Sequence, residues 1–216
     1  MIEGDRNLPH ENGLDELFKR YEYQKKELKA RLHEFTLVRQ EDYFYELCFC
    51  MCTPQSKARH ALVVVDKLKS MQFQTHPRDV SDVLGSREHY IRFHNQKSKN
   101  LQAMQGSWEQ INHILQDRTT VFEKRDLLAA TIRGIGMKEA SHFLRNIGIF
   151  GVAILDRHIL KHLKQLDITE DYPQSLTRGV YLDIEEKWSI FCTKVGIPLE
   201  EMDLLFWSME TGEILK

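Results

Sequence analysis

The sequence predicts an all-α protein. Apolar residues recur at spacings of three, four and seven along most of the 216 residues, which is the period of an amphipathic helix. Pro and Gly residues separate these runs, and no stretch shows the apolar–polar alternation of a half-buried strand. No fixed-period internal repeat is present either, so we expect distinct helices rather than a repeat array.

Local signals set the ends of several helices. Pro54 disfavours helical geometry at Thr53, Ser56 is a natural N-cap for the next helix, and Gly85 closes a short one. The predicted helices cover residues 14–39, 42–51, 57–71, 80–84, 87–105, 108–115, 122–133, 138–146, 156–166, 181–195 and 198–209.

Composition and cysteine usage indicate an intracellular protein. Apolar residues make up 42% and charged residues 29% of the chain, which is ordinary for a globular protein. The sequence contains no run of eighteen apolar residues that could span a membrane. Met1–Arg6 also lacks the apolar core of a signal peptide. Cys48, Cys50, Cys52 and Cys192 form no CxxC pair, so we expect reduced, half-buried thiols in a cytoplasmic protein.

The formal charge of −2 is unevenly distributed along the chain. Residues 165–216 hold eleven acids against four bases, a net of −7, so the first 164 residues carry +5. Residues 122–164 alone have eight bases against four acids. A basic face of this kind suits phosphate binding, although charges that merely solvate helices explain the asymmetry equally well.

One stretch, Arg133-Gly134-Ile135-Gly136-Met137-Lys138, reads as a tight glycine hairpin between two amphipathic helices. The two glycines permit backbone angles denied to other residues and leave room for a phosphate to approach. Amides at the start of the following helix carry its positive dipole end, which favours an anion. We therefore expect Gly134, Ile135 and Gly136 to hold the DNA backbone without reading its sequence.

Lys138 falls in the first turn of the helix after this hairpin. The positive end of the helix dipole disfavours an ammonium there, and a nucleophilic lysine needs the neutral amine. A phosphate contact or a solvated side chain is the commoner role for such a lysine. Asp156, eighteen positions further on, adds a carboxylate that can cap a helix or stabilise positive charge as a glycosidic bond breaks.

Together these residues resemble the helix-hairpin-helix DNA glycosylases, whose pattern is a Gly-hydrophobe-Gly hairpin, a catalytic lysine and an aspartate eighteen or nineteen residues later. Arg133 stands where proline is frequent in that family, a change that leaves the hairpin plausible. The endonuclease III branch carries a four-cysteine iron–sulfur loop near its C-terminus. This chain has only Cys192 in that region, so we expect no such cluster and no cofactor.

Three further stretches narrow the resemblance to the archaeal-type 8-oxoguanine DNA glycosylases, the second 8-oxoguanine family. Thr53–Ala58 is similar to the loop that wedges into the base stack, with Gln55 filling the gap. Arg92–Lys99 is similar to the family's Gly-Phe-Tyr-Arg-Asn-Lys-Ala-Lys helix. The ending Asp203–Lys216 has the family's Trp, Thr-Gly and final lysine.

This resemblance implies a bifunctional DNA glycosylase and AP lyase that excises 8-oxoguanine from double-stranded DNA. Lys138 would attack the sugar C1′ to form a Schiff base that then undergoes β-elimination, and Asp156 would stabilise the sugar cation. Trp207 and an aromatic side chain near Phe93 would sandwich the flipped base, and the carboxylate of Lys216 would accept a hydrogen bond from N7–H, which guanine lacks.

The resemblance also implies two helical subdomains flanking a cleft. Residues 36–150 would form a helical barrel with the helix-hairpin-helix motif, and residues 1–35 would pack with 151–216. We expect a monomer with no membrane contact. A structural monovalent cation at the carbonyls of Ala130, Ile132 and Ile135 is a further expectation by family analogy.

Two alternative functions and two alternative structural readings remain open at the sequence level. A glycosylase for oxidised pyrimidines or mismatched adenine would share these motifs, and so would a non-catalytic helix-hairpin-helix DNA-binding module. His142, His158 and His162 suggest zinc, but no carboxylate completes an HExxH-like pattern, so no catalytic metal is expected. Trp207 could instead pack in the core beside Leu204–Phe206, and the last residues could form a frayed tail.

Overall fold

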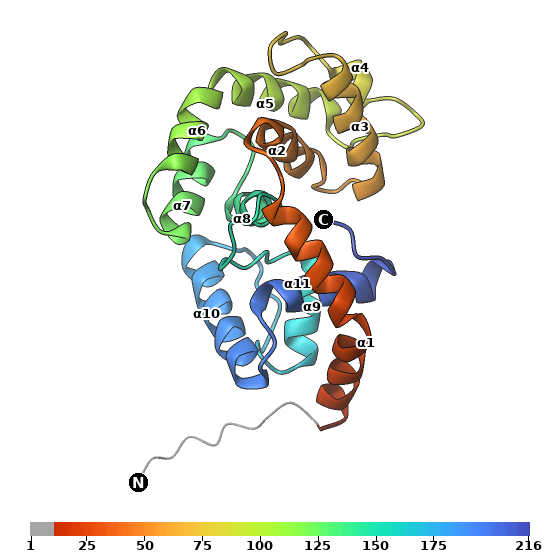
Figure 1. Ribbon diagram of the computed structural model, residues 1–216, viewed down its shortest axis with the longest axis vertical. Coiled ribbons are helices and arrows are strands. Elements are labelled where there is room, and N and C mark those ends of the chain that lie inside the picture. Colours follow the sequence, from red (N-terminus) through yellow and green to blue (C-terminus); the bar gives the residue numbers. More distant parts are fainter. Residues whose placement is uncertain (1–10) are drawn as a thin grey trace. The chain divides into compact units, whose positions relative to one another are not determined.

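Helices make up the regular structure of residues 11–216, which the computed structural model describes (Figure 1). No strand occurs in this part of the chain, and the all-α fold class is confirmed. The elements are α1 (Glu11–Thr36), the 3-10 helix η1 (Gln40–Asp42), α2 (Tyr43–Cys52), α3 (Ala58–Ser70), α4 (Ser81–Leu84), α5 (His94–Gly106), α6 (Trp108–Gln116), α7 (Val121–Thr131), α8 (Met137–Asn146), α9 (Arg157–Gln165), α10 (Arg178–Val195) and α11 (Leu199–Thr211).

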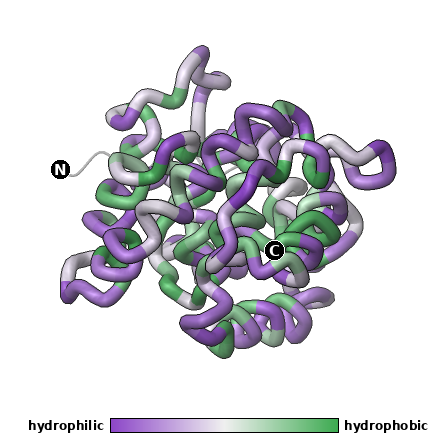
Figure 2. Tube along the Cα trace, turned by 90° about the horizontal axis from the view of Figure 1, so that it is seen from above, coloured by the Kyte–Doolittle hydropathy of each residue, from purple (hydrophilic) through white to green (hydrophobic). Residues whose placement is uncertain are grey.

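The helices are amphipathic, and hydrophilic and hydrophobic residues alternate along many of them in Figure 2. In proteins, most of the stability of an amphipathic helix comes from packing its apolar face against neighbouring elements. Among residues 11–216, no helix combines the length and the apolar character that crossing a membrane requires.

The chain divides into two compact units. One unit is continuous, Phe35–Phe150, and the other joins the chain up to Glu34 with Gly151–Lys216. In the continuous unit, α2 is the central helix and packs against α3, α5 and α8, while α7 and α8 pack as a hairpin pair. Because α2 is surrounded in this way, seven of its residues, from Phe44 to Cys52, are buried.

The discontinuous unit is built around α11, which packs against α9 and α10. Trp188 of α10 is fully buried and stacks on Phe206 of α11, with ring centroids 6.1 Å apart. The first helix joins this unit through Tyr21, whose hydroxyl donates a 2.8 Å hydrogen bond to Glu201 of α11. The two ends of the sequence therefore contribute to one core.

The helix predicted over residues 87–105 is the largest error in the sequence analysis. In the structure, α5 begins only at His94, because the backbone before it is bound elsewhere. The amide of Ile91 donates to the carbonyl of Leu84 (2.8 Å), and the amide of Arg92 donates to Ser56 Oγ (3.0 Å). These contacts with distant residues outweigh the local helical period.

Two smaller expectations are also wrong. Ser56 does not cap α3, because its hydroxyl is used by Arg92, and the N-cap position falls on Lys57 without a side-chain cap. The thiols are reduced as predicted but fully buried rather than half-buried, with exposures from 0% to 4%. Burial raises the pKa of the Cys52 thiol to about 12.

Candidate active site

The hairpin between α7 and α8 has the backbone geometry that its glycines permit. Gly134 has a φ of +89°, in the region that favours glycine. A Cβ at this position would also lie 2.0 Å from Asn100 Nδ2 of α5, so the hairpin and α5 approach each other closely. Gly136, with φ −117° and ψ −165°, is the N-cap of α8. Ile135 between them is buried and anchors the turn to the core.

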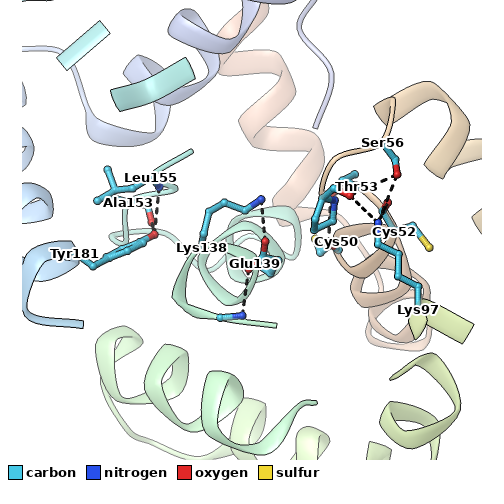
Figure 3. Close-up of polar contacts among 12 residues, drawn as sticks. Cys50, Cys52, Thr53, Ser56, Lys97, Lys138, Glu139, Ala153, Leu155 and Tyr181 are labelled. Atoms are coloured by element: carbon cyan, nitrogen blue, oxygen red, sulfur yellow. Dashed lines mark hydrogen bonds and ion pairs between the residues drawn. The ribbon is translucent and has the colours of Figure 1, made fainter. Parts of the chain in front are cut away.

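Lys138 lies in the first turn of α8, as predicted, and is about one quarter exposed. Its Nζ is 2.9 Å from Oε1 of Glu139 (Figure 3). The other carboxylate oxygen of Glu139 accepts a 3.1 Å hydrogen bond from the amide of Gly136. Glu139 therefore links the amine of Lys138 to the backbone of the hairpin.

Asp156 is the N-cap of α9. Its Oδ1 accepts hydrogen bonds from the amides of His158 (2.8 Å) and Ile159 (2.9 Å). Within residues 11–216, no hydrogen bond is made by its Oδ2. Oδ1 thus fixes the carboxyl group to the helix through two amide hydrogen bonds. Asp156 belongs to the discontinuous unit, whereas Lys138 belongs to the continuous one.

Two buried side chains of α10 hold the segment that leads into Asp156. The Tyr181 hydroxyl donates to the carbonyl of Ala153 (2.7 Å) and accepts from the amide of Leu155 (3.2 Å), as Figure 3 shows. Glu185 accepts from the amide of Ala153 at 2.6 Å. Because these bonds fix both sides of the segment, the position of Asp156 is set by α10 as well as by α9.

Gln55 and Phe93 lie on neighbouring turns of the continuous unit. Gln55 is exposed and has a φ of +56°, and Phe93 is 52% exposed with a φ of +60° at the start of α5. The two turns are joined by the hydrogen bond from the Arg92 amide to Ser56 Oγ. The Arg92 guanidinium also lies 4.9 Å from the Phe93 ring centroid. Both side chains are therefore presented to solvent on a constrained backbone.

Trp207 differs from the core residues beside it. Leu204, Leu205 and Phe206 are 0–1% exposed, whereas Trp207 is only partly buried. Its ring meets the edge of His158, with centroids 5.4 Å apart at 78°. Contact with α9 thus brings Trp207 close to the helix that Asp156 caps.

The C-terminal residues are held by hydrogen bonds rather than left as a loose end. The Thr211 hydroxyl donates to the carbonyl of Trp207 (2.9 Å), and Gly212 ends α11 with a φ of +78°. Arg31 of α1 donates through Nε to the carbonyl of Leu215 at 3.2 Å. The peptide at Leu215, next to Lys216, is therefore anchored to α1.

The three histidines considered as zinc ligands, His142, His158 and His162, lie in different units. His142 packs edge-on against Phe49 in the continuous unit. In the other unit, Glu210 of α11 lies 3.3 Å from His158 Nδ1 and 3.1 Å from His162 Nε2. The Lys161 ammonium is 2.6 Å from the same carboxylate, so a protein cation already neutralises it. Across residues 11–216, no cluster of three or more His, Cys, Asp or Glu side chains has a metal-binding arrangement.

The sequence analysis missed the residues that support these groups. Glu139 carries a readable signal, since Glu three residues after an N-cap commonly returns to the cap amide. Tyr181, Glu185 and Asn100 carry no such signal, because their partners lie between 26 and 34 residues away along the chain. The same applies to Lys97, whose partners are more than 40 residues away.

Comparison with known proteins gives a consistent result. Residues 28–197 match the model of a protein family described as 8-oxoguanine DNA glycosylase. A relative from Fusobacterium nucleatum, named 8-oxoguanine DNA glycosylase/AP lyase, is 39% identical over 215 residues, which cover 94% of this chain and 97% of the relative. A relative of the same name from Methanocaldococcus jannaschii is 33% identical over 193 residues, covering 88% and 91%.

Two solved structures share the fold. The Methanocaldococcus jannaschii 8-oxoguanine glycosylase/lyase, in complex with 15mer DNA containing 8-oxoguanine, has a TM-score of 0.83 at 31% identity and covers 93% of this chain and 99% of that one. The 8-oxoguanine DNA glycosylase of Thermotoga maritima has a TM-score of 0.85 at 27% identity, with 95% and 99% coverage. The chain therefore belongs to the helix-hairpin-helix family of 8-oxoguanine DNA glycosylases.

Proposed function

We propose that this protein excises 8-oxoguanine from double-stranded DNA and then cleaves the strand at the abasic site. The observation that carries the proposal is Lys138, in the first turn of α8 directly after the glycine hairpin, in a chain that belongs to this glycosylase family. The hairpin supplies phosphate binding and the lysine supplies the nucleophile, so one local motif can hold a DNA strand and attack its sugar.

The proposed reaction begins with flipping of the damaged base, which costs a few kcal/mol of unstacking. The Lys138 amine attacks C1′, the bond to the base breaks, and the electron pair leaves with the base. The departing base takes up a proton, and the nitrogen now attached to C1′ loses one. The C1′–O4′ bond then opens, with a proton going to O4′, and the C1′=N Schiff base that forms loses a C2′ proton as the C3′–O bond to the 3′ phosphate breaks. Asp156 stabilises the developing positive charge through the oxygen that does not cap α9.

Four residues are proposed to contact the flipped base or the gap that it leaves. Phe93 and Trp207 are proposed to stack on the two faces of the flipped base, and Gln55 to fill the gap left in the duplex. The Lys216 carboxylate accepts from N7–H of 8-oxoguanine. The anchored peptide at Leu215 supports this role, because a specificity contact needs a fixed position. We further propose that the protein acts as a monomer, inside the cell and with the chromosome.

Borohydride trapping on a duplex containing 8-oxoguanine tests the proposal. The wild type should give a covalent protein–DNA species, and Lys138→Gln should give none, because the amide cannot form a Schiff base. Lys187→Gln is the matched control, since Lys187 is an exposed lysine paired with Asp183 on α10. Absence of a trapped species with the wild type would rule out the lyase.

The same assay separates the alternatives. A non-catalytic binding module would bind the duplex without any trapped product. A panel of duplexes with oxidised pyrimidines or mismatched adenine would identify a glycosylase of different specificity.

A further inference from the structure

Lys97 of α5 is a buried lysine whose ammonium group is bound only by neutral oxygens. Lys97 as a whole is only 8% exposed. Its Nζ lies 2.8 Å from the carbonyl oxygen of Cys52, 2.7 Å from that of Pro54 and 3.5 Å from Ser56 Oγ (Figure 3). Cys52 is the last residue of α2, so the cation sits at the negative end of that helix dipole.

The three oxygens that Lys97 binds surround Gln55. Gln55 has a φ of +56°, a conformation that disfavours a side chain and persists only when its surroundings enforce it. Lys97 binds the loop on both sides of this residue, at Pro54 and Ser56. A single donor group with three N–H bonds thereby fixes the turn whose tip is exposed.

Burying the Lys97 ammonium without a carboxylate partner costs free energy, so a residue needed only to fill volume would not carry this charge. No carboxylate within residues 11–216 is paired with Lys97, and burial lowers the pKa of this lysine to about 8. The nearby Lys138 ammonium lowers that pKa further, whereas Glu139 raises it. A methionine would fill a similar volume without this cost. It would, however, remove the donor from the buried carbonyl of Cys52 and leave the Pro54 carbonyl with only a 3.5 Å contact from Ser56 Oγ.

The same helix also reaches the hairpin. Asn100 lies three residues after Lys97, on the same face of α5, and it packs against Gly134. The loop Thr53–Ala58 is called the Gln55 loop below. Lys97 and Asn100 thus connect both this loop and the hairpin before Lys138 to one helix, α5.

We propose that Lys97 is a positioning residue that holds the Gln55 loop in the geometry needed to wedge into the base stack. This inference rests on the proposed function, with Gln55 as the residue that fills the gap left by the flipped base. Lys97 itself does not contact the reacting atoms. Its role is to keep the wedge ordered before DNA binds, so that base flipping is not opposed by ordering of the loop.

The test compares two substrates that differ in their need for a wedge. Excision of 8-oxoguanine from a duplex requires a stacked base to be flipped, whereas borohydride trapping on a single-stranded oligonucleotide with an abasic site does not. Lys97→Met should reduce single-turnover excision from the duplex about 10- to 100-fold, as expected for a displaced positioning group, with trapping on the abasic strand unchanged. Lys99→Met, an exposed lysine on the same helix, is the control with the same change in charge.

A purely structural lysine predicts a different result. If Lys97→Met loses both activities in parallel, or loses neither, the proposal is wrong. Circular dichroism checks folding, and Ser56→Ala provides a milder second variant, because it removes one oxygen that Lys97 and the Arg92 amide share. Ser56→Ala should show the same selective loss to a smaller extent, and an equal loss on both substrates would also overturn the proposal.

A fluorescent readout separates this inference from the proposed function. With 2-aminopurine placed next to the lesion, the wild type should raise the fluorescence on binding by unstacking the base, and Lys97→Met should not. If the wild type unstacks the probe but excises nothing, the proposed function fails while the wedge role stands. Equal unstacking by wild type and Lys97→Met overturns the wedge role alone.

Discussion

At the scale of single residues, Asp156 allows its structural and chemical roles to be separated. Asn caps helices about as well as Asp, so Asp156→Asn should keep the hydrogen bonds to the His158 and Ile159 amides. It removes the negative charge, and we expect excision to fall about 10²- to 10³-fold, the usual effect of losing a group that stabilises transition-state charge.

Asp156→Ala is the matched comparison. It should lose excision and also lower the free energy of unfolding by about 1 kcal/mol, because the cap is gone. The measurements are single-turnover excision rates and denaturant unfolding of the two variants. Wild-type excision by Asp156→Asn would show that the residue is only a cap.

Two variants at Lys216 test the proposed role of its carboxylate in base recognition. Deleting Lys216 places the carboxylate one residue earlier, so excision of 8-oxoguanine should fall about tenfold or more while binding to an abasic-site duplex is kept. Lys216→Ala retains the carboxylate position and should excise nearly as the wild type does. Equal excision after the deletion would contradict the specificity role.

Arg31 should also affect the excision of 8-oxoguanine, but to a smaller extent than Lys216 does. Arg31→Met removes the hydrogen bond to the Leu215 carbonyl, so the tail is less well fixed and the ratio of 8-oxoguanine to guanine excision should fall. An unchanged ratio would mean that the tail is held adequately by Thr211 and Gly212.

At the scale of elements, the hairpin contains two glycines with different requirements. Gly134→Ala introduces a Cβ at a φ of +89° and against Asn100, so it should lower both the free energy of unfolding, by about 1–2 kcal/mol, and DNA affinity. Gly136→Ala places its Cβ no closer than 3.7 Å to any neighbour, at Glu139, so it should fold normally. If its Cβ obstructs the phosphate, only DNA affinity should fall.

Thermal unfolding and fluorescence anisotropy with a DNA duplex separate the two variants. A Gly134→Ala protein with wild-type stability would contradict the packing of α5 against the hairpin.

At the scale of the whole molecule, the net charge of −2 does not describe how DNA is bound. The basic residues of 122–164 lie apart in sequence from the acidic residues of 165–216, so phosphate contacts can form despite the overall sign. DNA affinity should therefore fall about tenfold or more between 50 and 200 mM salt, as counterion release requires. Arg133→Gln, at an exposed hairpin position, should reduce the slope of log affinity against log salt by about 1. A salt-independent affinity would contradict backbone binding.

Much of this molecule follows from local sequence. Local sequence signals located every α-helix of residues 11–216, although not the 3-10 helix η1. They succeed because the apolar face of an amphipathic helix recurs at i, i+3 and i+4. The hairpin and the Asp156 cap were predictable for the same reason, since each depends on residues within three positions of one another. The alternative that Trp207 is a core residue could not be decided from its neighbours, because adjacent residues on a helix point in different directions.

The errors and omissions concern contacts between distant residues. Residues 87–93 have the helical period, yet their backbone is bound by Leu84 and Ser56. In the sequence, Lys97 looks like one more polar residue of a helix. In the structure, it binds the end of α2 and the Gln55 loop, which lie more than 40 positions away along the chain. The sequence by itself thus determined the helices, the hairpin and the family of this protein. Tertiary structure decided which polar groups are buried against one another, because a buried donor is satisfied by whatever the fold brings within hydrogen-bonding distance.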